Sequence, residues 1–276
     1  MVEQFLPPPP RMETWSGRVF RAAVRYSCAG ISTSIFLEHR EGTIVLDCGD
    51  GAIRDMIEIL RAGFVEKDEE PIFDLEVSGN RIDALLITHG HFDHYSGILA
   101  MLEFLHLLGR TRPLPIIYPV GAASVEGIVD HFVEHLWETP GFDVDLVPVV
   151  PGDRLDISGT GVDVFKAFHR NSKPGVTGCP LDALSFRLTR DGETVAYSGD
   201  TSDVEALEPV VKDADLAIIE ATFPDGFEGA EGVHLTLDQA KEAGKAARAV
   251  MLIHFTAASF REMVGNTKIN PATREG

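Results

Sequence analysis

The sequence predicts an α/β fold in which two β-sheets stack face to face and helices cover their outer faces. Short apolar, β-branched runs alternate with amphipathic helical patterns along the chain, and no low-complexity linker interrupts them. With 276 residues, of which 44% are apolar, the chain can bury one large core. We therefore expect a single domain over residues 1–276, with its core at about 17–265 and with frayed ends.

The predicted strands are runs rich in β-branched and aromatic residues that are bounded by glycine, proline, asparagine or aspartate. In chain order they are 18–27, 33–39, 43–48, 83–88, 115–119, 143–150, 162–168, 183–189, 194–199, 216–221 and 249–255. Helices are predicted to begin near Ala52, Ser96, Ala122, Asp203 and Thr236, and the last two are typical N-cap residues. The acidic segment 66–80 has neither pattern, which predicts a solvated excursion.

The formal net charge of −19 excludes most nucleic-acid-binding classes, because an acidic surface repels polyphosphate. The nearest approach to a basic patch is Arg18, Arg21 and Arg25. These residues alternate with apolar ones, which indicates the solvated face of a strand. We therefore expect no strong binding of nucleic acid.

The three cysteines, Cys28, Cys48 and Cys179, lack CxxC spacing and indicate a reducing compartment. The first residues have neither a basic segment nor the apolar segment of a secretory signal. The most apolar helical pattern is interrupted by Glu103 and His106 and is too short to span a bilayer. We expect a cytoplasmic protein without membrane association. The sequence does not decide between a monomer and a homodimer.

The stretch "ITHGHFDHYSG" (87–97) places three of the ten histidines and an aspartate within six positions: His89, His91, Asp93 and His94. Packing does not favour this density, because each buried polar group needs a partner. Imidazole and carboxylate are the ligands that zinc and similar ions prefer. The stretch therefore predicts a metal site directly after the strand at 83–88.

Three more candidate ligands follow predicted strands in the same way. They are His169 in "VFKAFHRNS", Asp200 in "VAYSGDT" and His254 in "VMLIHFT". Strand ends can converge on one edge of a sheet, and loops at such edges commonly hold reactive groups. We expect these residues to complete the metal site.

The set HxHxDH, His, "GDT" and a final His resembles the metallo-β-lactamase superfamily, and within it the ribonuclease Z and phosphodiesterase branch. "LDCGDGAIRDM" is similar to that branch's "DCGEGTQ" segment, and "LAIIEATF" is similar to its "HEATF" strand. "VHLTLDQAKEAGKAARAVMLIHF" is similar to the branch's His-x-Thr helix and last ligand. The resemblance covers roughly residues 25–260 and implies a four-layer αββα sandwich.

The resemblance also implies two divalent metal ions, zinc in the first place and manganese or iron as alternatives. His89, His91 and His169 would hold one ion, and Asp93, His94 and His254 would hold the other, with Asp200 bridging them. Ions in such sites lie about 3.5–4 Å apart and clamp substrate oxygens between them.

Two further residues acquire roles from the same resemblance. His234 would donate a proton to the leaving oxygen, and Glu220 would orient its imidazole. The chain departs from the family pattern at Ile219, where the family has a histidine before the glutamate.

A competing pattern is "HFVEH" (131–135), which matches the HxxEH motif of a zinc peptidase class. Three fixed positions occur by chance more easily than the dispersed set above. His131, Glu134 and His135 are therefore expected to line the polar face of a helix.

The predicted reaction is cleavage of a small phosphodiester by a metal-bound hydroxide that Asp93 helps to orient. The same metals could serve hydrolysis of an ester, a thioester or a lactone, and ribonuclease Z-type RNA 3′-processing is a further alternative. A metal-binding or sensing protein without turnover is the alternative from another class.

In the bacterial ribonuclease Z type, the resemblance implies a long basic arm that grips RNA between the positions matching His169 and Asp200. Here only residues 170–199 separate the two, and the cations among them are Arg170, Lys173, Arg187 and Arg190. Each lost phosphate contact lowers the affinity for RNA. We therefore expect a small-molecule substrate.

Overall fold

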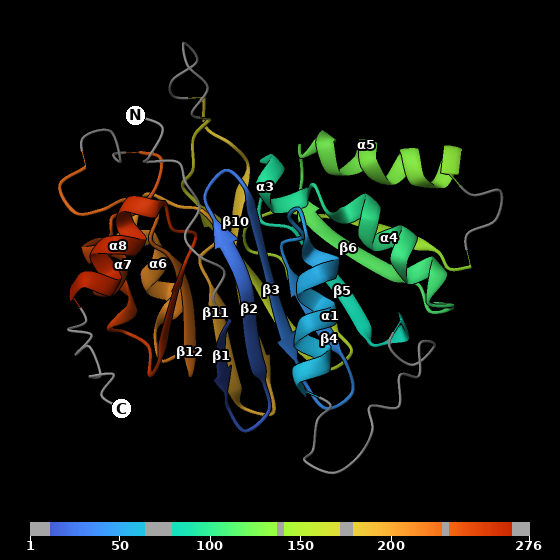
Figure 1. Cartoon of the computed structure of the whole chain (residues 1–276), viewed down its shortest axis with the longest axis horizontal. Coiled ribbons are helices and arrows are strands. Elements are labelled where there is room, and N and C mark those ends of the chain that lie inside the picture. Colours follow the sequence, from blue (N-terminus) through green and yellow to red (C-terminus); the bar gives the residue numbers. More distant parts are fainter. Residues whose placement is uncertain (1–11, 64–78, 137–140, 172–178, 228–231, 267–276) are drawn as a thin grey trace, which may run out of the picture.

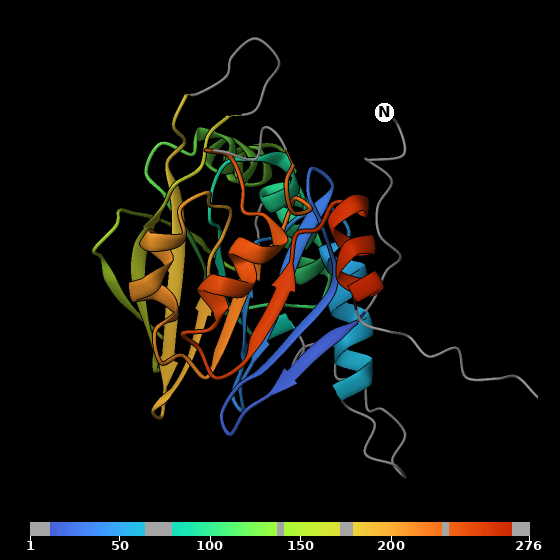
Figure 2. The same cartoon turned by 90° about the vertical axis from the view of Figure 1, so that its left-hand side faces the viewer.

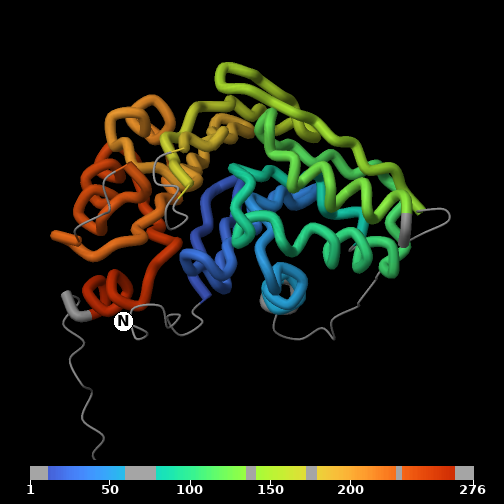
Figure 3. Tube along the Cα trace, turned by 90° about the horizontal axis from the view of Figure 1, so that it is seen from above, coloured from blue at the N-terminus to red at the C-terminus, as the bar shows by residue number. Residues whose placement is uncertain are grey.

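A computed structural model describes residues 12–63, 79–136, 141–171, 179–227 and 232–266. The elements form two stacked β-sheets with helices on both outer faces (Figure 1). Seen from above, the N-terminal half lies largely on one side of the molecule and the orange-red C-terminal elements on the other (Figure 3). The predicted four-layer α/β sandwich is confirmed.

The first sheet contains seven strands in sequential order. They are β1 (Glu13–Ser16), β2 (Arg21–Cys28), β3 (Ser32–Glu38), β4 (Thr43–Leu46), β5 (Ile82–Leu86), β6 (Leu114–Pro119) and β7 (Val144–Val149). The pairs from β1 to β4 are antiparallel, and those from β4 to β7 are parallel. Parallel strands need crossover connections, which here carry α1 (Ala52–Gly63), α4 (Ile98–Leu107) and α5 (Ala123–His131).

The second sheet has six strands in the order β13-β12-β11-β10-β9-β8. They are β8 (Arg154–Ile157), β9 (Thr160–Ala167), β10 (Ala183–Arg190), β11 (Glu193–Tyr197), β12 (Leu216–Glu220) and β13 (Val250–Ile253). The helices α6 (Val204–Val211), α7 (Leu237–Gly244) and α8 (Ala257–Asn266), orange to red in Figure 2, pack against this second sheet. The helices α6 and α7 begin at the predicted caps Asp203 and Thr236, whose side chains accept from backbone N–H groups.

Three apolar clusters hold the layers together. The first lies between the sheets and draws residues such as Leu37, Leu86, Phe186 and Ile218 from both of them. The second packs α1, α4 and α5 against the first sheet, and the third packs α6, α7 and α8 against the second. Central strands are therefore buried on both faces, which explains their continuous apolar runs.

Each predicted strand overlaps an observed one, but the sequence analysis missed β1 and β8. Both are four-residue edge strands in which exposed polar positions alternate with less exposed ones, so neither forms an apolar run. It also missed α8 and the short helix α3 (Phe92–Tyr95), which lies inside the histidine-rich stretch. Most of the predicted excursion at 66–80 lies outside the described residues, and the single-domain assignment stays a prediction.

Among the residues that the structure describes, no helix is both long enough and apolar enough to cross a membrane.

Candidate metal centre and active site

The candidate site lies where strands of both sheets end. Strands β9 and β11 both run antiparallel to β10, and β11, β12 and β13 run parallel to one another. These four strands therefore end at the same edge of the second sheet, where His169, Asp200, Glu220 and His254 lie. The loop after β5 joins them there, because Thr88 accepts a backbone hydrogen bond from Leu184 at 2.9 Å.

The structure brings all the predicted ligands together. Three overlapping groups have ligand atoms within 4.8 Å of one another: His89, His91, His169 and Asp200; Asp93, His94 and His254; and Asp200, His234 and His254. The first two groups match the division that the sequence analysis predicted. That these side chains bind metal stays a prediction.

Backbone conformation directs several of these side chains. His254 has a φ of +58°, which is unusual for a residue with a side chain and is commonly found at functional sites. Gly199, directly before Asp200, has a φ of +54°, and a Cβ there would lie 2.5 Å from the carbonyl oxygen of Leu184. The glycine of "GDT" is therefore required for the close approach of the two strands.

A buried carboxylate, Asp47, fixes two histidines through defined hydrogen bonds. His94 Nδ1 lies 2.7 Å from Asp47 Oδ2, so His94 donates from Nδ1 and turns Nε2 toward the cluster. The Thr88 hydroxyl donates to Asp47 Oδ2 at 2.9 Å and therefore accepts from His89 Nδ1 at 3.0 Å. His89 then also presents Nε2 without a proton.

Two more histidines are held in the same tautomer. His169 donates from Nδ1 to the carbonyl oxygen of Val233 at 2.8 Å. The Thr222 hydroxyl donates to Glu220 Oε2 at 2.6 Å and so accepts from His254 Nδ1 at 2.8 Å. Metal-binding histidines commonly donate their second N–H to an oxygen acceptor in this manner.

The imidazole nitrogen atoms that face the centre of the cluster need a cation beside them. His89 Nε2 is buried and has no hydrogen-bond partner, and burial holds the pKa of His89 well below its usual range. His91 Nδ1 lies 3.0 Å from His169 Nε2, and His94 Nε2 lies 3.3 Å from His254 Nε2. A proton or a metal ion has to lie between the nitrogens of each pair, so the donor set fits divalent metal ions.

Asp200 lies at the centre of the cluster. Its Oδ2 is 3.3 Å from His94 Nε2 and 3.7 Å from His89 Nε2, and its Oδ1 is 3.6 Å from His254 Nδ1. Burial alone raises the pKa of Asp200, but His254 and His94 lower it far below the usual value. For His169, burial lowers the pKa to about 3. The cluster thus combines an ionised carboxylate with a neutral imidazole, the forms that bind metals.

His234 is placed differently from the other histidines. Its Nδ1 lies 2.9 Å from Glu220 Oε1, which also accepts from the backbone N–H of Thr201. Burial lowers the pKa of His234, but the carboxylates of Glu220 and Asp200 outweigh burial and raise it to about 9. The two carboxylates therefore favour the protonated form of His234.

The departure at Ile219 lies outside the site. Successive residues of a strand point to opposite faces, so Ile219 points away from Glu220. It belongs to the apolar cluster between the second sheet and its helices. Isoleucine at position 219, in place of the family's histidine, therefore removes no group from the candidate site.

Asp47 and two of the residues that donate hydrogen bonds to it, Thr88 and Tyr197, were not among the predicted site residues. Asp47 is fully buried with a φ of +57°, and it also accepts from the Tyr197 hydroxyl at 2.5 Å. One signal was present, because Asp47 directly follows an apolar strand, as Asp200 nearly does. The glycine and aspartate residues that follow it in "DCGDG" are typical of turns, so the sequence indicated a turn residue instead.

We expect Asp47→Asn to weaken metal binding about 10- to 100-fold, the usual effect of losing a group that orients a metal ligand. The amide cannot accept the hydrogen bonds of His94, Thr88 and Tyr197 as the carboxylate does. Titration of metal into the stripped protein measures the change. Tyr197→Phe is the matched control and should have a smaller effect; equal affinity in Asp47→Asn and the unaltered protein would contradict the role of Asp47.

The HxxEH pattern does not contribute to the candidate site. His131 ends α5, and Glu134 lies in the following π-helical turn η2 (Phe132–Leu136); both side chains are exposed. Neither belongs to a group of described residues that could hold a metal ion. These exposed positions agree with the prediction that His131 and Glu134 line the polar face of a helix.

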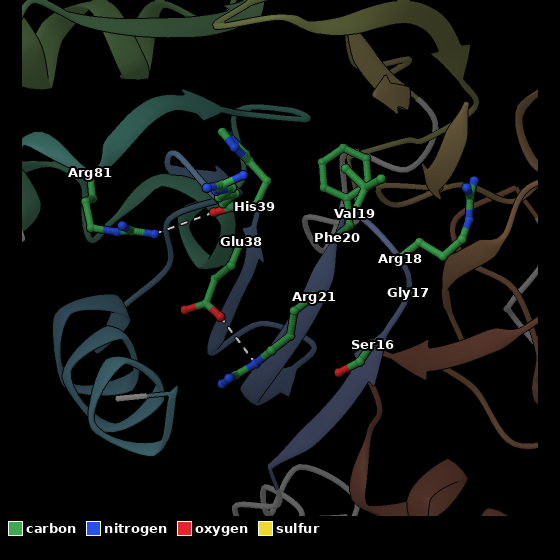
Figure 4. A pocket seen from close by; sticks show the side chains of 10 residues that line it. Ser16, Gly17, Arg18, Val19, Phe20, Arg21, Glu38, His39 and Arg81 are labelled. Atoms are coloured by element: carbon green, nitrogen blue, oxygen red, sulfur yellow. Dashed lines mark hydrogen bonds and ion pairs between the residues drawn. The ribbon is translucent and has the colours of Figure 1, made fainter. Parts of the chain in front are cut away.

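The three arginines considered as a basic patch lie next to carboxylates. Arg21 Nε is 3.2 Å from Glu38, Arg25 Nε is 2.5 Å from Glu58, and Arg18 Nε is 4.0 Å from Glu193. Arg18 and Arg21 also line a pocket of about 320 Å³ at the ends of β2 and β3 that lie away from the metal ligands (Figure 4). Carboxylates therefore offset much of the positive charge of these arginines.

The sandwich and its cluster of histidines and aspartates define a class, the metal-dependent hydrolases of the metallo-β-lactamase fold. The model of the family described as "Beta-lactamase superfamily domain" matches residues 43–255. The chain belongs to this superfamily of metal-dependent hydrolases.

The relatives agree with this assignment. A ribonuclease Z from Myxococcus xanthus is 28% identical over 246 residues, which cover 74% of this chain and 73% of the relative. The human short-form tRNase Z has a similar structure, with a TM-score of 0.61, 22% identity and coverage of 84% of this chain and 91% of that chain. Zn²⁺-bound PqqB from Methylobacterium extorquens has a TM-score of 0.62 and 16% identity, with coverage of 86% and 83%. The two structures share the fold.

Proposed function

We propose that this hydrolase holds two divalent metal ions and cleaves a small phosphodiester. The observation that carries the proposal is the position of His234, which pairs with Glu220 and lies beside the ligand groups, where it shares a group with Asp200 and His254. A site that only stores or senses metal has no need of a proton donor. The pairing of His234 with Glu220 supports an enzyme that protonates a leaving oxygen.

The proposed ligands follow the two groups. His89, His91 and His169 hold one ion, Asp93, His94 and His254 hold the other, and Asp200 contacts both. Zinc is the preferred ion, with manganese or iron as alternatives, because the donors are imidazole and carboxylate. The zinc in the structurally similar PqqB is compatible with this choice.

When bound, such ions activate a water molecule and neutralise the charge of a phosphate group. The protein supplies the remaining functions. Asp93 is fixed by a hydrogen bond from the backbone N–H of Gly30 at 2.7 Å, so it can orient the attacking water. His234 holds a proton at Nε2 for the leaving oxygen while Glu220 fixes its Nδ1.

RNA 3′-processing is the second candidate, because the curated relatives carry the name ribonuclease Z. Two features favour a small diester instead. Strands β10 (8 residues) and β11 (5 residues) take up much of the interval between His169 and Asp200, which leaves little length for a basic arm. The acidic chain and its paired arginines also weaken attraction to RNA.

A screen with three substrates tests the proposal. The purified, metal-loaded protein is assayed on bis(p-nitrophenyl) phosphate, on p-nitrophenyl acetate and on a precursor transfer RNA at physiological salt. We expect the highest kcat/KM on the phosphodiester. A higher value on the ester would favour the ester, thioester or lactone alternative, and efficient removal of the 3′ trailer would favour RNA processing.

A further inference from the structure

Two stacked phenylalanines lie next to the proposed proton donor. The rings of Phe223 and Phe227 have centroids 4.4 Å apart and planes only 6° from parallel. Phe223 in turn meets the His234 ring at 5.6 Å and 74°, in a T-shaped contact. The three rings form a continuous series that leads outward from the candidate site.

The outer ring of this series is accessible. Phe227 is 39% exposed, although burying a phenylalanine would be favourable. Two other phenylalanines in the described part of the chain are exposed, Phe168 to a similar extent, 41%, and Phe92 more, 66%. Phe168 packs under the Lys166 ammonium at 4.6 Å, and Phe92 meets Tyr95. Of these three rings, Phe227 is the one that leads to His234 through a ring contact, its contact with Phe223.

The segment that carries the pair is anchored at several points. Phe223 donates from its backbone N–H to Leu235, and Phe227 donates to Pro224, which closes a turn. The side chain of Asp225 within this turn accepts from the backbone N–H of Asp238 at 2.7 Å. A ring held in this way loses little freedom when a ligand stacks on it.

We propose that Phe223 and Phe227 form a stacking platform for the base of a nucleoside that leaves as the diester is cleaved. The inference rests on the proposed function, because it places the leaving oxygen beside His234. A phenolate carries its oxygen directly on the ring, whereas a ribose separates the reacting oxygen of a nucleoside from its base. The exposed ring of Phe227 contacts His234 only through Phe223, with centroid separations of 4.4 and 5.6 Å, so a leaving group whose ring is set back from the reacting oxygen suits it better.

A platform of this kind selects for a base but not for its identity, since every base has a planar face. Stacking on an aromatic side chain corresponds to about a 5- to 150-fold gain in affinity. The substrate class would therefore be a nucleoside-containing phosphodiester without strong base preference.

The test uses adenylyl-adenosine and two analogues, each lacking one base. The nucleoside released without phosphate identifies the leaving side. Binding is measured separately by calorimetry, with non-hydrolysable methylene-phosphonate forms of the same three compounds. We expect binding to weaken about 5- to 150-fold when the leaving-side base is removed. Phe227→Leu, which keeps an apolar side chain but loses the ring, should abolish this ratio.

Phe168→Leu is the matched control, because it removes a ring of similar exposure, 41% against 39%, that packs under Lys166 instead. It should preserve both the ratio and the metal content. A ratio that survives Phe227→Leu would overturn the platform. If removing one of the bases weakens binding and Phe227→Leu abolishes this dependence, but no diester is cleaved, the proposed function fails and only the stacking of a base on the platform stands. Cleavage without any base dependence would overturn the platform alone.

Discussion

Replacing Asp200 by alanine is expected to cause the largest loss of metal and of activity of any single substitution in the protein. Asp200 is fully buried, lies within 4 Å of His89, His94 and His169 through Oδ2, and approaches His254 through Oδ1. It is the residue proposed to contact both ions. We expect the loss to exceed the ~10–100-fold that follows when a group that merely orients a ligand is removed.

Elemental analysis of protein prepared without chelator measures this effect. His169→Ala serves as the comparison, because His169 belongs to one ligand group only. It should retain the ion held by the other group. Equal metal contents in the two variants would contradict a bridging role for Asp200.

The second large effect is expected for His234→Ala, which should keep its metal but lose roughly 10²–10⁴-fold in turnover of diesters with poor leaving groups. Burial lowers the pKa of His234, but Glu220 and Asp200 raise it to about 9, which favours the protonated imidazole. A poor leaving group needs that proton, whereas p-nitrophenolate leaves as a stable anion.

The measurement is kcat for two diesters that differ only in the leaving group, one an alkoxide and the other p-nitrophenolate. His234→Ala should slow the first reaction far more than the second. A similar loss on both substrates would show that His234 supports the site structurally and donates no proton. Unchanged metal content confirms that the ligands remain in place.

Sequence reasoning located the site because its residues directly follow apolar runs. His89, His169 and His254 each follow a strand, and the strand directions that bring these ends together follow from short antiparallel turns and parallel crossovers. The sequence spacing of the ligands therefore carried most of the information. The fold class depended on the same alternation of strands and helices.

The groups that orient the ligands were not predictable in the same way. Asp47 is 41 residues from Thr88, 47 from His94 and 150 from Tyr197. Its hydrogen bonds with Thr88 and His94 form only once β4 and β5 have paired, and the one with Tyr197 forms only once the second sheet has packed on the first. The edge strands β1 and β8 were missed for a different reason. They bury too little apolar surface to produce a pattern.

We propose that this chain needs two metal ions to cleave a phosphodiester. The most direct measurement is the rate of bis(p-nitrophenyl) phosphate hydrolysis as zinc is added stepwise to the metal-stripped protein. We predict a rate that rises from background and reaches its plateau at about two equivalents of zinc per chain, as expected for a two-metal site. A rate that stays at background through the whole titration, or one that reaches its plateau at a single equivalent, would contradict the claim.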